Sequence, residues 1–148
     1  SRIMSLRDGT KKMSKSEESD YSRINLKDTA DEIVKKIKKA KSDSESIPDN
    51  LKSLEKKPEA LNLLNIYSEV SKINLEKALK EMAGKEYSHI KSKLADLLVS
   101  EILPVGKEIN KLMNDKAYLL QILKKGTEKA SIKAEENLKN IREKVGLI

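Results

Sequence analysis

The chain has 148 residues, a formal net charge of +7, and equal shares, 37% each, of hydrophobic and charged residues. It contains no cysteine and a single histidine, His89, which excludes disulfides, thiolate metal sites and a Ser-His-Asp triad. We therefore predict no metal site. Because no apolar run approaches the length of a membrane span and no signal-peptide pattern opens the chain, we expect a cytoplasmic protein without a membrane partner. The basic charge favours a polyanion partner, although a lysine-rich solvated surface would give the same balance.

The first 27 or so residues lack helical periodicity and are rich in Ser, Lys, Asp and Glu. A short apolar start, with Ile3, Met4 and Leu6, precedes a long polar stretch. This pattern predicts the end of a strand followed by an irregular, mobile arm.

From Asp28 the apolar residues recur at helical spacing, which predicts an all-α helical bundle over residues 28–148. The absence of Trp and Phe also suits packed helices better than aromatic-rich strands. Asp28 is the predicted N-cap of the first helix. We interpret the charged side chains opposite its apolar residues as one solvated face that could also meet RNA phosphates: Lys35, Lys36, Lys38, Lys39 and Lys41.

The remaining helices are placed by their start and stop signals. Residues 42–57 read as a polar loop, Pro58 as the first turn of a second helix, and Asn74 as the cap of a third that ends at Gly84. In the long apolar stripe that follows, Pro104 predicts a kink or a junction of two helices. Asp115 is expected to cap a short helix that Gly126 interrupts before the last apolar stripe.

The segment between Gly9 and Ser16 has the strongest chemical signal. Lys12 and Lys15 can place two ammonium groups against a polyphosphate, while Ser14 and Ser16 can add hydrogen bonds. Gly9 is expected to let this loop swing. The segment is not a Walker A motif, because Ser14 stands where that motif requires Gly-Lys. From these residues alone, a catalytic phosphate-binding loop and a solvated tail stay equally open.

Residues 12–16, Lys-Met-Ser-Lys-Ser, resemble the KMSKS signature of class I aminoacyl-tRNA synthetases letter for letter. The flanks, Arg-Ile-Met-Ser-Leu at 2–6 with Asp8 and Thr10, are similar to the bacterial-type tryptophanyl-tRNA synthetase family rather than to its tyrosyl relatives. Pro58-Glu59 with Asn-Leu-Leu-Asn-Ile-Tyr at 62–67, and the stretch from Gly126 onward, resemble the same family, so that the resemblance covers nearly the whole chain.

The resemblance implies an ATP-dependent ligase of protein biosynthesis. Such an enzyme converts tryptophan and ATP to tryptophanyl-adenylate and pyrophosphate, then passes the aminoacyl group to tRNA(Trp), using ATP with magnesium. By matched position, Lys12 and Lys15 would be catalytic and bind the ATP phosphates, with Met13, Ser14 and Ser16 shaping the loop and Ile3 beside the adenine. The family works as a homodimer, and its helical region contacts the anticodon arm. There are two departures: Gly9, where Pro is frequent, predicts a more mobile loop, and Glu17, where Asp is usual, preserves the charge.

The resemblance also divides the chain. Residues 1–27 would be the KMSKS catalytic loop and the end of a Rossmann domain, and residues 28–148 a C-terminal anticodon-binding-type helical domain. The HIGH signature is missing, because His89 stands in Tyr-Ser-His-Ile. We therefore expect a carboxy-terminal part that is inactive alone and is open to being a monomer. We further expect residues 1 to about 25 to be disordered or displaced, Met13 to be exposed, and the last helix to expose an apolar patch.

Two other functions compete with the ligase. One is a stand-alone basic helical module that binds nucleic acid, and the other is a purely structural helical interaction domain. A strong salt dependence of RNA binding would favour the first of these over the second.

Overall fold

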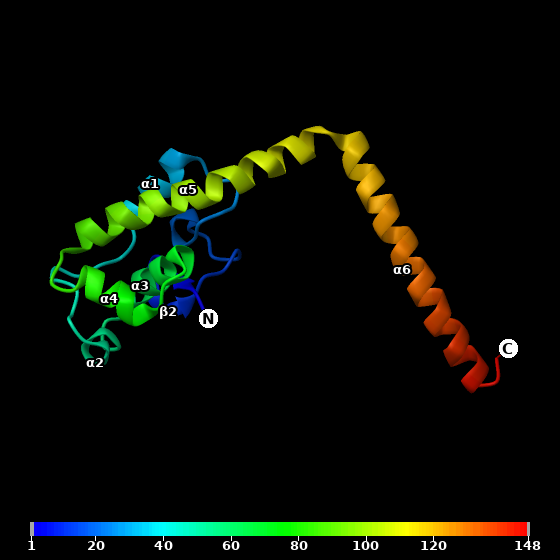
Figure 1. The fold of residues 1–148 in the computed structure, drawn as a ribbon, viewed down its shortest axis with the longest axis horizontal. Helices are drawn as coiled ribbons and strands as arrows, with labels where there is room; N and C mark the ends of the chain where they lie inside the picture. Colours follow the sequence, from blue (N-terminus) through cyan, green and yellow to red (C-terminus); the bar gives the residue numbers. More distant parts are fainter. Residues whose placement is uncertain (1, 148) are drawn as a thin grey trace. The chain divides into compact units, whose positions relative to one another are not determined.

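Residues 2–147 of the chain are described by the computed structural model (Figure 1). Six α-helices dominate this part of the chain, and a two-stranded hairpin precedes them. The elements are β1 (Met4–Ser5), β2 (Asp8–Lys12), the 3-10 helix η1 (Asp20–Ser22), α1 (Ala30–Lys38), α2 (Leu51–Leu54), α3 (Pro58–Ser71), α4 (Leu75–Met82), α5 (Tyr87–Asn114) and α6 (Lys116–Lys144). The all-α prediction is confirmed, with the hairpin as an addition.

The chain forms two compact units, with the division inside α5 between Lys107 and Glu108. The first unit contains the hairpin and α1 to α4 together with most of α5. The second contains the end of α5 and all of α6. The predicted boundary near residue 27 stays a prediction, and both sides of it lie within the first unit.

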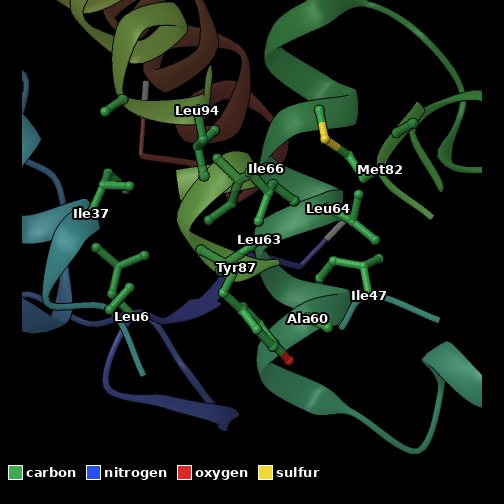
Figure 2. Packing of buried hydrophobic residues seen from close by; sticks show 14 of the residues in the cluster. Leu6, Ile37, Ile47, Ala60, Leu63, Leu64, Ile66, Met82, Tyr87 and Leu94 are labelled. Carbon is green, nitrogen blue, oxygen red and sulfur yellow. The ribbon is translucent and has the colours of Figure 1, made fainter. Parts of the chain in front are cut away.

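The core of the first unit is built from its helices, mainly α1, α3, α4 and α5, together with Leu6 from the turn of the hairpin (Figure 2). Leu63 and Leu64 of α3 lie at its centre and are at most 1% exposed. Ile37 of α1, Met82 of α4 and Leu94 of α5 are fully buried around them. Aliphatic side chains thus supply most of this core, as the composition predicts.

Both ends of α1 are stabilised by side chains. Thr29, not Asp28, is the N-cap, and it forms a reciprocal capping box with Glu32. The predicted cap was wrong because the carboxylate of Asp28 turns inward. At the other end, Arg7 Nη1 donates to Lys39 O at 2.6 Å, and Lys91 Nζ donates to Ala40 O at 2.7 Å. Cations beside the last carbonyls of a helix complement its dipole.

The starts of α3 and α4 follow the sequence signals. Pro58 occupies the first turn of α3, and the side chain of Asn74 accepts a hydrogen bond from Lys77 N at the start of α4. Gly84, at a φ of +72°, follows the end of α4. These three predictions are confirmed.

The stretch predicted as a polar loop contributes to the core. Asn50 caps α2 by accepting from Ser53 N, and Leu54 at the end of α2 is fully buried. Ile47, before α2, is 1% exposed. The three aliphatic residues of this polar stretch, Ile47, Leu51 and Leu54, with Pro48 among them, are too few to predict this packing.

Of the last two helices, α5 is a single helix, one of the two arrangements predicted around Pro104, and α6 is longer than predicted. α5 continues through Pro104, and α6 runs without a break through Gly126. Gly126 costs helix stability relative to alanine but removes no hydrogen bond, so the interruption predicted there was wrong. None of the residues of α6 that the structure describes is buried. Its exposed apolar side chains, as expected for the last helix, include Tyr118, Leu120, Ile122, Leu123, Ile132, Leu138 and Ile141.

Within residues 2–147, every helix is too short or too polar to cross a membrane.

Candidate functional site

The signature loop, defined as residues 12–16, leaves the hairpin at the last residue of β2. β1 and β2 are antiparallel, with Met4 opposite Lys12. Met13 N donates to Ile3 O at 3.1 Å, which extends the pairing by one step. Ile3 and Met13 are both half-buried and pack against the core of the first unit. The expectation that Met13 would be exposed was therefore wrong, because this chain itself supplies the surface that covers it.

The hairpin is fixed to the helices through its turn. Leu6 lies in the core, where Figure 2 labels it. Its side chain is 2% exposed. Its backbone N–H donates to Ser22 O at 2.8 Å, and Lys41 N donates to its carbonyl at 2.7 Å. For residues 2 to about 25, the prediction of disorder or displacement was wrong, because these contacts come from the chain's own helical unit. Residue 1 lies outside the described residues.

Asn62 of α3 holds the first strand. Its amide Nδ2 donates to Met4 O at 2.9 Å and to Ser5 O at 3.3 Å, while its Oδ1 accepts from Met4 N at 2.9 Å. The residue is 3% exposed. No role was predicted for Asn62 beyond its place in the family resemblance. The available signal was an amide at a buried position of the α3 pattern, flanked by Leu61 and Leu63.

Gly9 brings β2 against the start of α3. A Cβ at this position would lie 2.5 Å from both Pro58 C and Pro58 O, and 2.7 Å from Glu59 N. Real Cβ atoms do not approach backbone this closely, so glycine is required by space. The predicted role of Gly9 as a source of loop mobility was wrong, since the residue is buried in a backbone contact.

Within the signature loop, the two lysines face solvent. Lys12 and Lys15 are exposed, and in the described part of the chain neither ammonium group has a hydrogen bond or ion pair. Lys11, by contrast, lies 3.6 Å from Asp8 Oδ2. Two free cations on one short loop can bind a polyanion without first breaking an internal ion pair.

The serines of the loop are hydrogen-bonded to each other. Ser14 Oγ lies 2.8 Å from Ser16 Oγ and accepts from Ser16 N at 3.3 Å. This contact closes the turn in which Lys15 stands. The loop therefore presents Lys15 at the tip of a short hydrogen-bonded turn.

A buried ion cluster follows the signature loop. Lys36 Nζ lies 2.6 Å from Asp20 Oδ2 and 2.6 Å from Asp28 Oδ2, and its side chain is 5% exposed. Burial acts to lower the pKa of Lys36, but hydrogen bonds to the two aspartates outweigh it and raise the pKa above the ordinary value. Lys36 was predicted on a solvated face, which was wrong. The lysines predicted beside it are exposed: Lys35, Lys38, Lys39 and Lys41.

The last two features considered in the sequence are His89 and a possible metal site. His89 is exposed in the first turn of α5. Among residues 2–147, no group of three or more histidine and acidic side chains is placed to hold a metal ion.

Comparison with known proteins decides the family. Residues 1–102 match the family described as tRNA synthetases class I (W and Y). The chain belongs to this class I tRNA synthetase family. The resemblance carried by residues 12–16 and their flanks is thereby confirmed for this synthetase chain.

The sequence of this synthetase chain is similar to those of bacterial tryptophan–tRNA ligases. It is 47% identical over 147 residues to that of Mesorhizobium japonicum, covering 99% of the chain and 41% of the relative. It is 48% identical over 145 residues to that of Brucella melitensis, covering 98% of the chain and 41% of the relative. The chain thus spans about two fifths of the length of these curated relatives.

Two solved structures share the fold of the synthetase chain. The tryptophanyl-tRNA synthetase of Campylobacter jejuni superposes with a TM-score of 0.68 at 24% identity, over 99% of this chain and 44% of that one. That of Mycoplasma pneumoniae gives a TM-score of 0.58 at 30% identity, over 74% of this chain and 35% of that one.

Proposed function

We propose that this chain is the phosphate-binding loop and helical part of a tryptophan–tRNA ligase, acting with further protein of the kind that its longer relatives contain. The observation that carries the proposal is the pair of exposed, unpaired lysines, Lys12 and Lys15, on a loop whose supports are buried. The family and the similarity to tryptophan–tRNA ligases support it.

The proposed reaction joins tryptophan to ATP, with release of pyrophosphate, before transfer to tRNA(Trp). Negative charge builds up on the pyrophosphate as its bond to the α-phosphorus breaks. Lys12 and Lys15 would contact these phosphate oxygens and stabilise that charge more than the charge of bound ATP. Met13, Ser14 and Ser16 would set the shape of the loop, and Ile3, beside Met13, would lie against the adenine. Magnesium would enter bound to ATP.

Further features of the proposal follow the family resemblance. The complete ligase would be a cytoplasmic homodimer, and tRNA would contact the helical part of this chain. The net charge of +7 and the exposed lysines of α1 support an RNA partner. If so, the affinity for tRNA should fall steeply with salt.

Tryptophan-dependent pyrophosphate exchange by the full-length ligase tests the proposal. Lys15→Ala and Lys12→Ala should each lower kcat for exchange by about a hundredfold, comparable with the loss of one transition-state donor. Lys11→Ala is the matched control, because Lys11 is adjacent, exposed and paired with Asp8. It should change the rate by about threefold at most.

Two results would overturn the proposal. If Lys12→Ala and Lys15→Ala exchange as fast as Lys11→Ala, the loop does not bind the reacting phosphates. If the full-length protein binds RNA with a strong salt dependence but never catalyses exchange, the alternative of a basic helical nucleic-acid-binding module replaces the ligase.

A further inference from the structure

The signature loop has a second attachment beyond its exit from the hairpin. Arg23 Nη1 donates to Glu17 O at 2.9 Å and to Ser19 O at 3.5 Å. Glu17 directly follows the signature loop, and Met13 is fixed at the other side by its bond to Ile3. The loop therefore spans two anchored points, with Lys15 midway between them.

The second anchor leads back into the helical core. Arg23 Nη2 lies 3.0 Å from Asp20 Oδ1, and the other oxygen of the same carboxylate lies 2.6 Å from Lys36 Nζ. Asp20 thus joins two cations whose side chains are 17% and 5% exposed. Its own side chain is 54% exposed, so its carboxylate is the accessible member of this chain of charges.

Lys36 is the fixed end of this series of ion pairs. It lies on α1, between the fully buried Ile33 and Ile37. Its ammonium group also pairs with Asp28 Oδ2, which accepts from Asn25 N at 2.8 Å. Since both the helix and the side chain of Lys36 are held on several sides, a change in Asp20 leaves Lys36 in place and frees Arg23.

We propose that the Lys36–Asp20–Arg23 chain is a positioning device that sets the far end of the signature loop and thereby aims Lys15. This inference rests on the proposed function. The three residues touch no reacting atom and are positioning residues. They act because an error in placement of about 1 Å at a group contacting the transition state is costly in rate.

The charge pattern explains why the device suits a loop that receives a polyanion. Asp20 and Asp28 together neutralise Arg23 and Lys36 within the cluster, so neither cation competes with Lys12 and Lys15 for phosphate. The guanidinium of Arg23 has several donors in a fixed plane, which lets it bind Asp20 and the Glu17 carbonyl together. A lysine at that position could not reproduce both directions.

A double-mutant cycle in the full-length ligase tests the inference, using pyrophosphate exchange with kcat and the KM for tryptophan measured separately. Asp20→Asn removes the charge and keeps the shape of the side chain. We expect kcat to fall roughly ten- to hundredfold, with the KM for tryptophan unchanged. Asp31→Asn is the control, since Asp31 is an exposed aspartate in the first turn of α1 without a described partner, and it should leave kcat unchanged.

The cycle is completed by Lys15→Ala. If Asp20 acts through Lys15, adding Asp20→Asn to Lys15→Ala causes no further loss. Arg23→Gln removes the ion pair between Arg23 and Asp20, one step nearer the loop, and should lower kcat in the same way. This variant replaces Asp20→Asn in the cycle if Asp20→Asn is unstable.

The possible failures are separable. If kcat of Asp20→Asn equals that of Asp31→Asn, the positioning inference is overturned while the ligase proposal stands. The same holds if the fold losses in kcat from Asp20→Asn and Lys15→Ala multiply fully in the double variant. If Lys15→Ala itself has no effect on exchange, it is the proposed function that fails.

Discussion

At the scale of single residues, the site depends on side chains that make room or satisfy buried polar groups. Gly9 allows the backbone of β2 to meet the first turn of α3. Asn62 pairs with the backbone of β1, and Tyr87 donates from its hydroxyl to Asp43 Oδ2 at 3.2 Å. Each of the three fixes the position of the hairpin or of a loop relative to a helix.

Gly9→Ala should destabilise the first unit. The added methyl group would collide with the backbone of Pro58 and Glu59, which cannot rotate away. Overpacking of this kind costs about 1–3 kcal/mol, measured as the free energy of unfolding in urea. Gly126→Ala is the control, because nothing lies within 4 Å of a Cβ there. Within α6 it should be neutral or stabilising by about 0.5–1 kcal/mol. Equal effects of the two changes would contradict the close approach of β2 to α3.

Because of Tyr87, the free energy of unfolding of the first unit should vary with pH in the alkaline range. Burial raises the pKa of Tyr87 above its ordinary value of 10, and the neighbouring Asp43 adds to this. Above about pH 10 the unfolded chain loses the tyrosine proton while the folded chain keeps it, so stability falls as the pH rises.

Tyr87→Phe should flatten this dependence. Between about pH 8 and about pH 10.5, the wild type should lose roughly 1 kcal/mol more unfolding free energy than the variant. At about pH 8 the variant itself should be less stable by about 1 kcal/mol, through loss of the bond to Asp43. Urea titrations of both proteins at the two pH values measure the difference. If the unfolding free energies of the wild type and the variant fall equally between the two pH values, Tyr87 ionises equally in the folded and unfolded states.

At residue scale, the sequence singles out the two lysines proposed to bind phosphate, but not the residues that support their loop. Lys12 and Lys15 could be selected because a five-residue signature is a local pattern. Asn62 and Lys36 could not, because Asn62 depends on partners 57 or 58 residues away, and Lys36 depends on two carboxylates of which only Asp28 is buried. A lysine on a lysine-rich helix gives no local sign that it is buried.

At the scale of elements, capping and strand pairing decide how α1 and the hairpin meet. α1 is short, and its capping box satisfies backbone N–H groups that would otherwise lack partners. It also carries Lys36, which connects it to the segment after the signature loop. A weaker start of α1 should therefore loosen the first unit.

Thr29→Ala should destabilise the first unit by about 1 kcal/mol, the usual contribution of an N-cap. Thr29→Asn should restore the stability, because asparagine caps a helix as well as threonine does. Thermal unfolding of the three proteins makes the comparison. An Ala variant as stable as the Asn variant would show that the Thr29–Glu32 box contributes nothing.

Helix starts were predictable where a single residue determines them, as at Pro58 and Asn74. The first cap was assigned one residue early, since Asp28 and Thr29 are both good capping residues and only the burial of Asp28 separates them. The hairpin could not be predicted, because β1 is two residues long and its pairing depends on contacts with α3.

At the scale of the whole molecule, the two compact units differ in how they are stabilised. The first has a continuous aliphatic core. In the second, none of the described residues of α6 is buried, and helix propensity with local pairs such as Lys133–Glu136 remains. Helices that lack tertiary packing are marginally stable in water.

Amide hydrogen exchange of this chain alone should therefore separate the units. Amides in the middle of α3, around Leu63 and Leu64, should exchange only through global opening of the first unit. Amides in the middle of α6, around Ala130, should exchange much faster. Mass spectrometry of peptides from the two helices provides the measurement. Equal protection would mean that α6 is covered in solution by a second chain, against the exposure described.

The burial of Leu6 has a consequence for the order in which the molecule is made. The hairpin is synthesised before the helices of this unit, but the amide of Asn62 that holds Met4 lies 58 residues later, and Leu94 of the same core later still. Contacts of such long sequence separation form slowly, because the intervening chain must be closed. The hairpin that carries the signature loop therefore reaches its final form only after the helices that pack against it have been synthesised and have folded.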